Sequence, residues 1–142
     1  MAFEEQRAWI GGIVAVVSYG AYLAVLFVRS RDVPLDEVAY AWPLAIFIGA
    51  GVVAMIVAHA VIGLRARDEA GQLDERDREI DRFAKVVSQA FLVIASFAAL
   101  LMAVAEWDQF WIANAIVLGF FTSAMAESVA KVAAYHRDFQ AW

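Results

Sequence analysis

Four long apolar stretches, set apart by charged segments, constrain the fold of this chain more than any other feature. They comprise residues 9–28, 38–64, 86–105 and 110–132 of the 142-residue sequence. Each has about the 20 residues that an α-helix needs to cross roughly 30 Å of hydrocarbon. Hydrophobic residues make up 63% of the sequence, too much for a soluble domain with a polar surface. We therefore predict an all-α polytopic protein, in which residues 1–142 form a single domain of four transmembrane helices in the lipid bilayer.

Lysine and arginine residues are distributed unevenly between the segments that alternate across the membrane. Arg29 and Arg31 flank one side. Nine flank the other side, namely Arg7, Arg65, Arg67, Arg76, Arg78, Arg82, Lys85, Lys131 and Arg137. Because cytoplasmic segments carry the excess of basic residues, we predict a multi-pass protein of the inner (plasma) membrane with both termini in the cytoplasm. The first stretch follows an acidic leader and lacks a small-residue cleavage site, so we expect a retained helix rather than a signal peptide.

Two prolines refine the expected boundaries of the second helix. Pro34, with the acidic residues Asp36 and Glu37 after it, is typical of a first helical turn. Pro43 would then lie one or two turns inside the helix, where a mild kink can form. Tryptophan and tyrosine side chains gather near the expected membrane surfaces, where such rings act as anchors.

Residues 65–85 form the sizeable polar segment of the sequence, with six basic and seven acidic side chains. Asp74 can cap a helix, and Asp81 precedes Lys85 by four residues, the favourable spacing for a helical ion pair. We therefore predict that the third helix begins two or more turns before the membrane, as a cytoplasmic extension. This extension is either a solvated, self-paired helix or a docking surface for another subunit or a cytoplasmic protein. The candidate docking residues are Asp74, Arg76, Asp77, Arg78, Ile80 and Phe83.

The septet Asp-Glu-Arg-Asp-Arg-Glu-Ile at residues 74–80 comes directly before an expected membrane helix. In a four-span chain of this length, it resembles a family of small bacterial and archaeal integral membrane proteins of uncharacterised function. Members of that family carry a similar Asp-Glu-Arg-Asp motif in the middle loop, and some are encoded beside small helix-turn-helix regulators. The resemblance implies a regulatory partner and carries over no catalytic residues.

Few polar residues interrupt the apolar stretches, and placing each of them inside a membrane costs free energy. His59, Gln89 and Glu127 lie about 10–12 Å from the middle of their helices and in one layer on the cytoplasmic side. Lys131 follows Glu127 by four residues, so the two can form an ion pair within one helix. We favour a structural role, in which this intramembrane polar cluster holds helices together. The alternatives are proton or ion handling and side chains that extend toward the membrane surface.

Small residues at four-residue spacing predict close helix packing. One stripe consists of Ala115, Gly119 and Ser123, and it leads back from Glu127. A second stripe consists of Ala50, Ala54 and Ala58. Because four short helices need fewer such stripes than this chain carries, we predict a homodimer.

Recognisable catalytic and cofactor-binding motifs do not occur in the sequence, so we do not expect an enzyme. The chain has no cysteine, Gly-rich phosphate loop, Ser-His-Asp set or His-x-x-x-His pair, and we expect no cofactor and no metal. His59 and His136 lie at depths too different for a shared haem. The net charge of −5 argues against direct nucleic-acid binding.

Two classes of function are consistent with these residues. The first is a non-catalytic membrane protein that self-associates or docks a partner, in a regulatory role, through its small-residue faces and the charged extension at residues 73–85. The second is a small proton-coupled or ion transporter or channel that uses Glu127 and His59.

Overall fold

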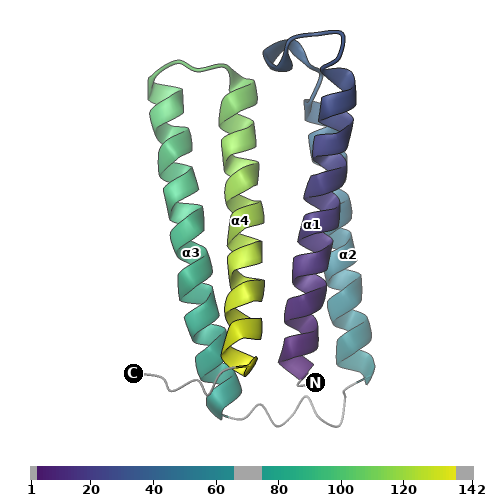
Figure 1. Cartoon of the computed structure of the whole chain (residues 1–142), viewed down its shortest axis with the longest axis vertical. Coiled ribbons are helices and arrows are strands. Elements are labelled where there is room, and N and C mark those ends of the chain that lie inside the picture. Colours follow the sequence, from purple (N-terminus) through teal and green to yellow (C-terminus); the bar gives the residue numbers. More distant parts are fainter. Residues whose placement is uncertain (1–2, 66–74, 137–142) are drawn as a thin grey trace.

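The chain folds into four long α-helices, as the computed structural model shows for the residues that it describes, 3–65 and 75–136 (Figure 1). These are α1 (Phe3–Arg29), α2 (Ala41–Arg65), α3 (Glu75–Val104) and α4 (Gln109–His136), with a short 3-10 helix, η1 (Leu35–Glu37), between α1 and α2. All four α-helices are long and apolar enough to cross a membrane. The predicted all-α fold of four membrane helices is therefore confirmed.

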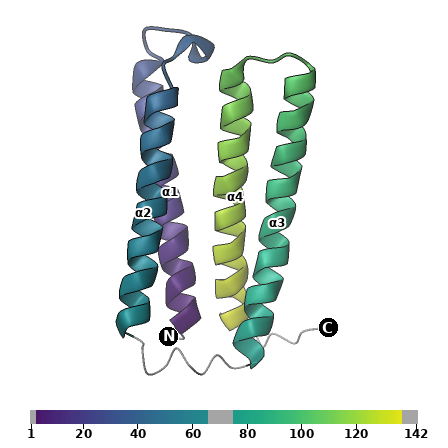
Figure 2. The same ribbon diagram turned by 180° about the vertical axis from the view of Figure 1, so that it is seen from behind.

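The helices pack side by side in the order α3, α4, α1, α2 (Figures 1 and 2). Helix α4 packs against α3 and α1, whereas α2 packs against α1. At one end of the bundle, which we call the charged end, α1 and α3 begin and α2 and α4 end. At the opposite end, which we call the turn end, short connections join α1 to α2 and α3 to α4.

Large apolar side chains cover the outside of the bundle. Val104, for example, is 75% exposed, and Trp42 near the turn end is 80% exposed. Trp107 and Trp111 are also exposed at the turn end, whereas Trp9 lies toward the charged end. Exposed apolar surface on this scale is suited to contact with lipid, and the tryptophans lie where membrane anchors are found.

The second helix begins later than the sequence predicted. Pro34 precedes η1 rather than opening α2, and α2 starts at Ala41 instead of residue 38. Pro43 therefore lies in the first turn of α2. Backbone amides in a first turn have no partner within the helix, so the missing N–H of proline costs no hydrogen bond there. The expected position of Pro43, one or two turns inside the helix, was wrong because α2 starts later than predicted. Arg29 Nη1 donates a 2.8 Å hydrogen bond to Ala39 O and holds the connection.

The third helix begins well before residue 86, as its charge pattern predicted. It starts at Glu75, whereas the expected cap Asp74 lies outside the described residues. Helix α4 likewise continues to His136, beyond the predicted end at residue 132. Tyr135 Oη donates a 2.8 Å hydrogen bond to Asp77 Oδ1, so the end of α4 lies against the start of α3.

The connection between α3 and α4 is a tight helix end. Glu106 has a φ of 56°, the left-handed region that few residues other than glycine adopt. The Trp107 amide donates to Met102 O at 3.0 Å, and the Glu106 amide donates to Ala103 O at 3.2 Å. These two bonds form a Schellman motif, which satisfies carbonyl groups at the end of α3.

A cluster of buried aromatic and aliphatic residues lies toward the turn end. Tyr22 and Leu26 of α1 pack there with Phe110 of α4. The ring of Tyr40 meets that of Phe110 edge to face at 5.2 Å, so the connection after α1 also joins this core. The charged end combines buried apolar residues, such as Ile80 and Ala84, with a network of ion pairs.

Candidate binding site at the charged end

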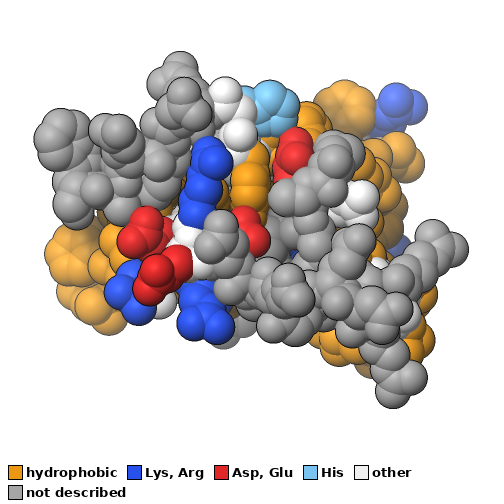
Figure 3. Space-filling model, turned by 90° about the horizontal axis from the view of Figure 1, so that it is seen from below, with side chains coloured by type: hydrophobic (Ala, Val, Ile, Leu, Met, Phe, Trp, Pro, Cys, Tyr) orange, Lys and Arg blue, Asp and Glu red, His pale blue; other side chains and the backbone are white. Residues whose placement is uncertain are grey.

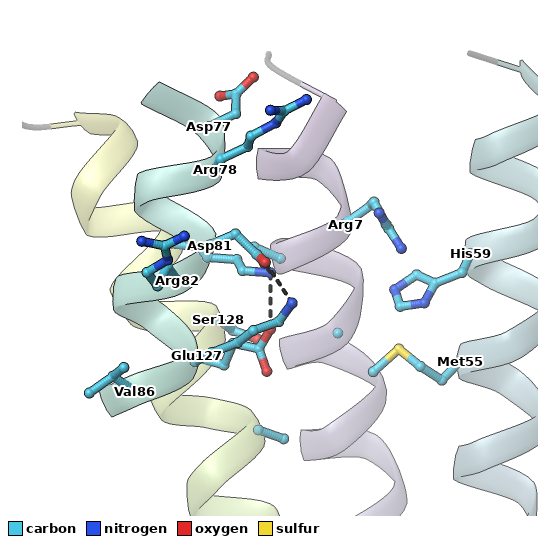
Figure 4. Close-up of a pocket in the computed structure, with 15 residues that line it drawn as sticks. Arg7, Met55, His59, Asp77, Arg78, Asp81, Arg82, Val86, Glu127 and Ser128 are labelled. Atoms are coloured by element: carbon cyan, nitrogen blue, oxygen red, sulfur yellow. Dashed lines mark ion pairs between the residues drawn. The ribbon is translucent and has the colours of Figure 1, made fainter. Parts of the chain in front are cut away.

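A cavity of about 760 Å³ opens among the four helices at the charged end (Figure 4). Its size falls in the range of small-molecule sites, roughly 300–1,000 Å³. The charged side chains that line it are five basic residues, Arg7, Arg78, Arg82, Lys85 and Lys131, and three carboxylates, Asp77, Asp81 and Glu127. Figure 3 shows basic and acidic side chains gathered together at this end of the molecule.

Lys131 of α4 is the centre of an ion-pair network between α3 and α4. Its Nζ lies 2.7 Å from Asp81 Oδ1 and 2.9 Å from Glu127 Oε1, and its side chain is 11% exposed. The other oxygen of Asp81 lies 2.6 Å from Lys85 Nζ. Two carboxylates therefore compensate the charge of the largely buried lysine, which would be costly without them.

Asp81 belongs to the extension of α3, before the expected membrane segment. Burial alone would raise the pKa of this carboxyl group. Hydrogen bonds and charges from Lys131 and Lys85 outweigh burial and lower the pKa below its ordinary value. Asp81 is therefore held in its ionised form and keeps both lysines in place.

The α1 and α2 side of the cavity carries a different pair of residues. Arg7 of α1 and His59 of α2 point toward one another across the space between these helices (Figure 4). Met55, one turn before His59, lies below them. The cavity is thus lined by basic or titratable groups on both of its sides.

Arg78 and Arg82 differ from Lys85 and Lys131 in lacking a carboxylate partner within the described residues. Within the described ranges, neither makes an ion pair or a hydrogen bond. Arg78 extends from α3 toward the start of α1 (Figure 4). Since basic residues exceed carboxylates by five to three, the cavity has an excess positive charge of two.

An apolar groove continues from the cavity toward the turn end. It has a volume of about 270 Å³ and lies among α1, α2 and α4. Met55 and Ala124 line both the cavity and the groove, so the two spaces adjoin. Aromatic rings form part of the groove wall, where Tyr19 stacks on Phe121 with centroids 4.5 Å apart.

The predicted intramembrane polar cluster is only partly brought together. His59, Glu127 and Lys131 all line the cavity. Gln89 does not line it and is exposed, because the neighbouring Ser88 occupies the buried side of α3. Successive helical residues are about 100° apart around the axis, so depth alone could not place Gln89 toward the other two. The prediction for Gln89 concerned its depth, and the structure does not bring its side chain to His59 and Glu127 in the cavity.

The first small-residue stripe lies where α4 meets α3. A Cβ atom at Gly119 would overlap the Cβ of Ala95. Ser123 Oγ donates a 2.9 Å hydrogen bond to Ser88 O, and Ala115 is half-buried. These residues therefore pack within the chain.

The second stripe lies largely outside the helix contacts. Ala50 and Ala54 are exposed, and Ala58 is half-buried. Helix α2 instead approaches α1 through Gly51, where an added Cβ would lie 3.1 Å from Ser18 Oγ. The two stripes consequently differ, since the second leaves a small-residue face of α2 uncovered in the chain.

The candidate docking residues of the extension fall into separate groups. Asp77 and Arg78 line the cavity, whereas Arg76 is exposed and lies outside it. Phe83 is 45% exposed, but Ile80 is only 1% exposed. Ile80 therefore packs within the chain, and its expected place on an exposed docking surface was wrong. Asp74, the remaining member, lies outside the described residues.

Several polar residues of the structure were not among the site residues predicted from the sequence. Arg7, Arg82 and Asp81 line the cavity although each was read only as a loop or helix-surface charge. Asn114 accepts a 2.7 Å hydrogen bond from Tyr22 Oη near the turn end. An amide inside an apolar stretch was the signal for Asn114, and the same reasoning that singled out Glu127 applies to it.

Comparisons of the chain with known protein families, with curated proteins and with solved structures found no match. The resemblance to the four-span family with the Asp-Glu-Arg-Asp motif stays a prediction.

Proposed function

We propose that this chain is a non-catalytic integral membrane protein that docks an anionic partner at its charged end. The observation that supports this is the cavity, where five basic side chains stand against three carboxylates. Lys131 and Lys85 are engaged by carboxylates, which leaves Arg78 and Arg82 to meet a negatively charged group. Guanidinium groups suit this task because they bind phosphate and carboxylate oxygens in pairs.

The charged end is placed in the cytoplasm by the same proposal. Nine basic residues belong to the segments of this side and two to the other, and cytoplasmic segments carry such an excess. Because the chain has no cysteine, single cysteines can be introduced at the exposed Glu79 and Gln109. On intact cells, an impermeant thiol reagent should label position 109 and not position 79. The reverse pattern would overturn the orientation.

Anion binding is tested directly with inorganic pyrophosphate and the purified full-length chain. Titration calorimetry in a mild, uncharged detergent should detect binding that weakens as salt is added. The double variant Arg78→Gln and Arg82→Gln should bind much more weakly, whereas Arg76→Gln, outside the cavity, serves as the matched control. Absence of binding by the original chain, or equal losses in both variants, would count against the proposal.

Self-association is the second part of the proposal, as a homodimer through α2. The exposed small residues Ala50 and Ala54 support it, since such faces allow helices to approach closely. Sedimentation in mild detergent should give the mass of two chains, and Ala54→Leu should shift the equilibrium toward one. A single-chain mass at every concentration would exclude the dimer.

Transport remains the second candidate function because His59 and Glu127 line the same cavity. A proton or cation carrier needs a carboxylate that can release its partner. Glu127 lies 2.9 Å from Lys131 Nζ, a contact that favours a structural role. The contacts of Glu127 therefore support docking better than transport.

A further inference from the structure

The charged cavity and the adjoining apolar groove are together complementary to an amphiphilic molecule. The cavity offers excess positive charge, and the groove that adjoins it at Met55 and Ala124 is lined mainly by apolar side chains. Phe47 and Val52 of α2 and Phe121 of α4 line the groove. A ligand that fills both spaces needs an anionic group at one end and a hydrocarbon chain at the other.

The cavity also lies at the depth of a lipid head group. Arg7 precedes the interfacial Trp9 by two residues, and Arg78 and Arg82 precede the apolar part of α3, which begins at residue 86. The groove runs from there along the apolar parts of α1, α2 and α4, which are helices long and apolar enough to cross a membrane. Basic pockets between membrane helices on the cytoplasmic side are known to suit the head groups of anionic lipids.

We propose that the cavity binds the phosphate head group of an anionic phospholipid of the cytoplasmic leaflet, with one acyl chain lying in the apolar groove. Arg78 and Arg82 contact the phosphate, because neither has an ion pair or hydrogen bond in the described chain that would occupy it. This inference rests on the proposed function and names the anionic partner. It differs from general attraction to a membrane surface in requiring particular arginines and a particular groove.

Native mass spectrometry of the delipidated full-length chain tests the proposal. Dioleoyl phosphatidylglycerol is compared with dioleoyl phosphatidylcholine, which has the same acyl chains and no net charge. We expect the anionic lipid to bind at least about tenfold more tightly, since each basic residue near the surface contributes roughly fivefold. Equal binding of the two lipids would overturn the proposal.

Two matched pairs of variants locate the lipid. Arg78→Gln and Arg82→Gln should each weaken phosphatidylglycerol binding about fivefold, whereas Arg76→Gln should leave it unchanged. Val52→Trp narrows the groove and should weaken binding of both lipids, whereas Val53→Trp, equally exposed but outside the groove, should not. Far-ultraviolet circular dichroism checks that each variant is folded. If Arg78→Gln does not fold, Arg82→Gln carries the test, because the Arg82 side chain is exposed.

The outcomes separate the lipid from other occupants. If pyrophosphate binds and phosphatidylglycerol does not, or if Val52→Trp has no effect on either lipid, the lipid proposal falls while the docking of an anion stands. If neither probe binds, both fall. A dimer that Val52→Trp dissociates would show that a second copy fills the groove, which also overturns the lipid proposal. An equal loss in Arg76→Gln would show unspecific surface charge and would overturn it as well.

Discussion

The hydroxyl group of Tyr22 in α1 and the side-chain carbonyl of Asn114 in α4 are joined by a hydrogen bond of 2.7 Å. The amide of Asn114 also donates to Phe110 O at 2.8 Å, so the asparagine joins two helices and its own backbone. Tyr22 is 1% exposed. This contact holds the turn end of the bundle, where α1 and α4 meet.

Tyr22→Phe should lower the free energy of unfolding by about 1 kcal/mol, because it removes an interhelical hydrogen bond of the size measured in membrane proteins. Tyr19→Phe is the control, since no hydrogen bond of the Tyr19 hydroxyl is formed in the described chain. Thermal or denaturant unfolding in mild detergent measures both variants. Equal losses would show that the hydrogen bond contributes nothing specific.

Gly119→Ala should destabilise the chain by about 1–3 kcal/mol, because the added methyl group would overlap Ala95 and push α3 and α4 apart. Gly49→Ala and Gly63→Ala are matched controls, since an added Cβ meets nothing within 4 Å at either position. These controls should be neutral or stabilising by up to about 1 kcal/mol, because alanine favours helix. A loss in the controls as large as at Gly119 would contradict the packing argument.

Lys131→Met should cost about 3 kcal/mol, because it leaves Asp81 and Glu127 without the cation between them. Lys85→Met removes a lysine that is 61% exposed and pairs with the same Asp81, and it should cost less than about 1 kcal/mol. Unfolding of the two variants in the same detergent gives the comparison. If Lys85→Met proved as costly, Lys131 would not be the centre of the network.

Glu127→Gln separates a structural role from transport. We expect the variant to retain much of its stability, because an amide can still form hydrogen bonds at that place. Vesicles reconstituted with either form should show no specific flux under an imposed pH gradient. A flux of the original chain that Glu127→Gln abolishes, without loss of folding, would establish the transport function instead.

Glu106→Gly should stabilise the chain by about 0.5–1 kcal/mol, because glycine adopts a positive φ without strain. Glu106→Ala keeps the Cβ and removes the carboxylate, so it separates backbone strain from charge. It should be neutral or slightly destabilising. Stabilisation by both variants to the same extent would assign the effect to the charge.

Helix number and the ion pair within α4 could be predicted because both depend on residues close together in the sequence. Twenty apolar residues specify a membrane helix, and Glu127 and Lys131 lie one turn apart whatever surrounds them. The contact of Lys131 with Asp81 joins residues of two helices, and no spacing in the sequence encodes it. Depth placed Gln89 with His59, but rotation about the helix axis decides contact, and neighbouring helices set that rotation.

Helix boundaries show the same limit. The position of Pro34 indicated a helix start. Proline is also disfavoured in a helix interior, and because α2 starts at Ala41, Pro43 lies in its first turn. The extension of α3 was predictable from its charge spacing. Its burial of Ile80 was not, because that depends on how far α4 continues toward His136.

The packing order of the helices determines how a molecule reaches the groove. Helices α2 and α3 lie at opposite ends of the order and form no extensive contact in the described chain. The proposed lipid could therefore enter sideways from the membrane, with no helix having to part from another. The rate of lipid exchange with the surrounding membrane would then be limited by how fast the lipid moves along the groove. The exchange kinetics would contain no step in which the protein opens.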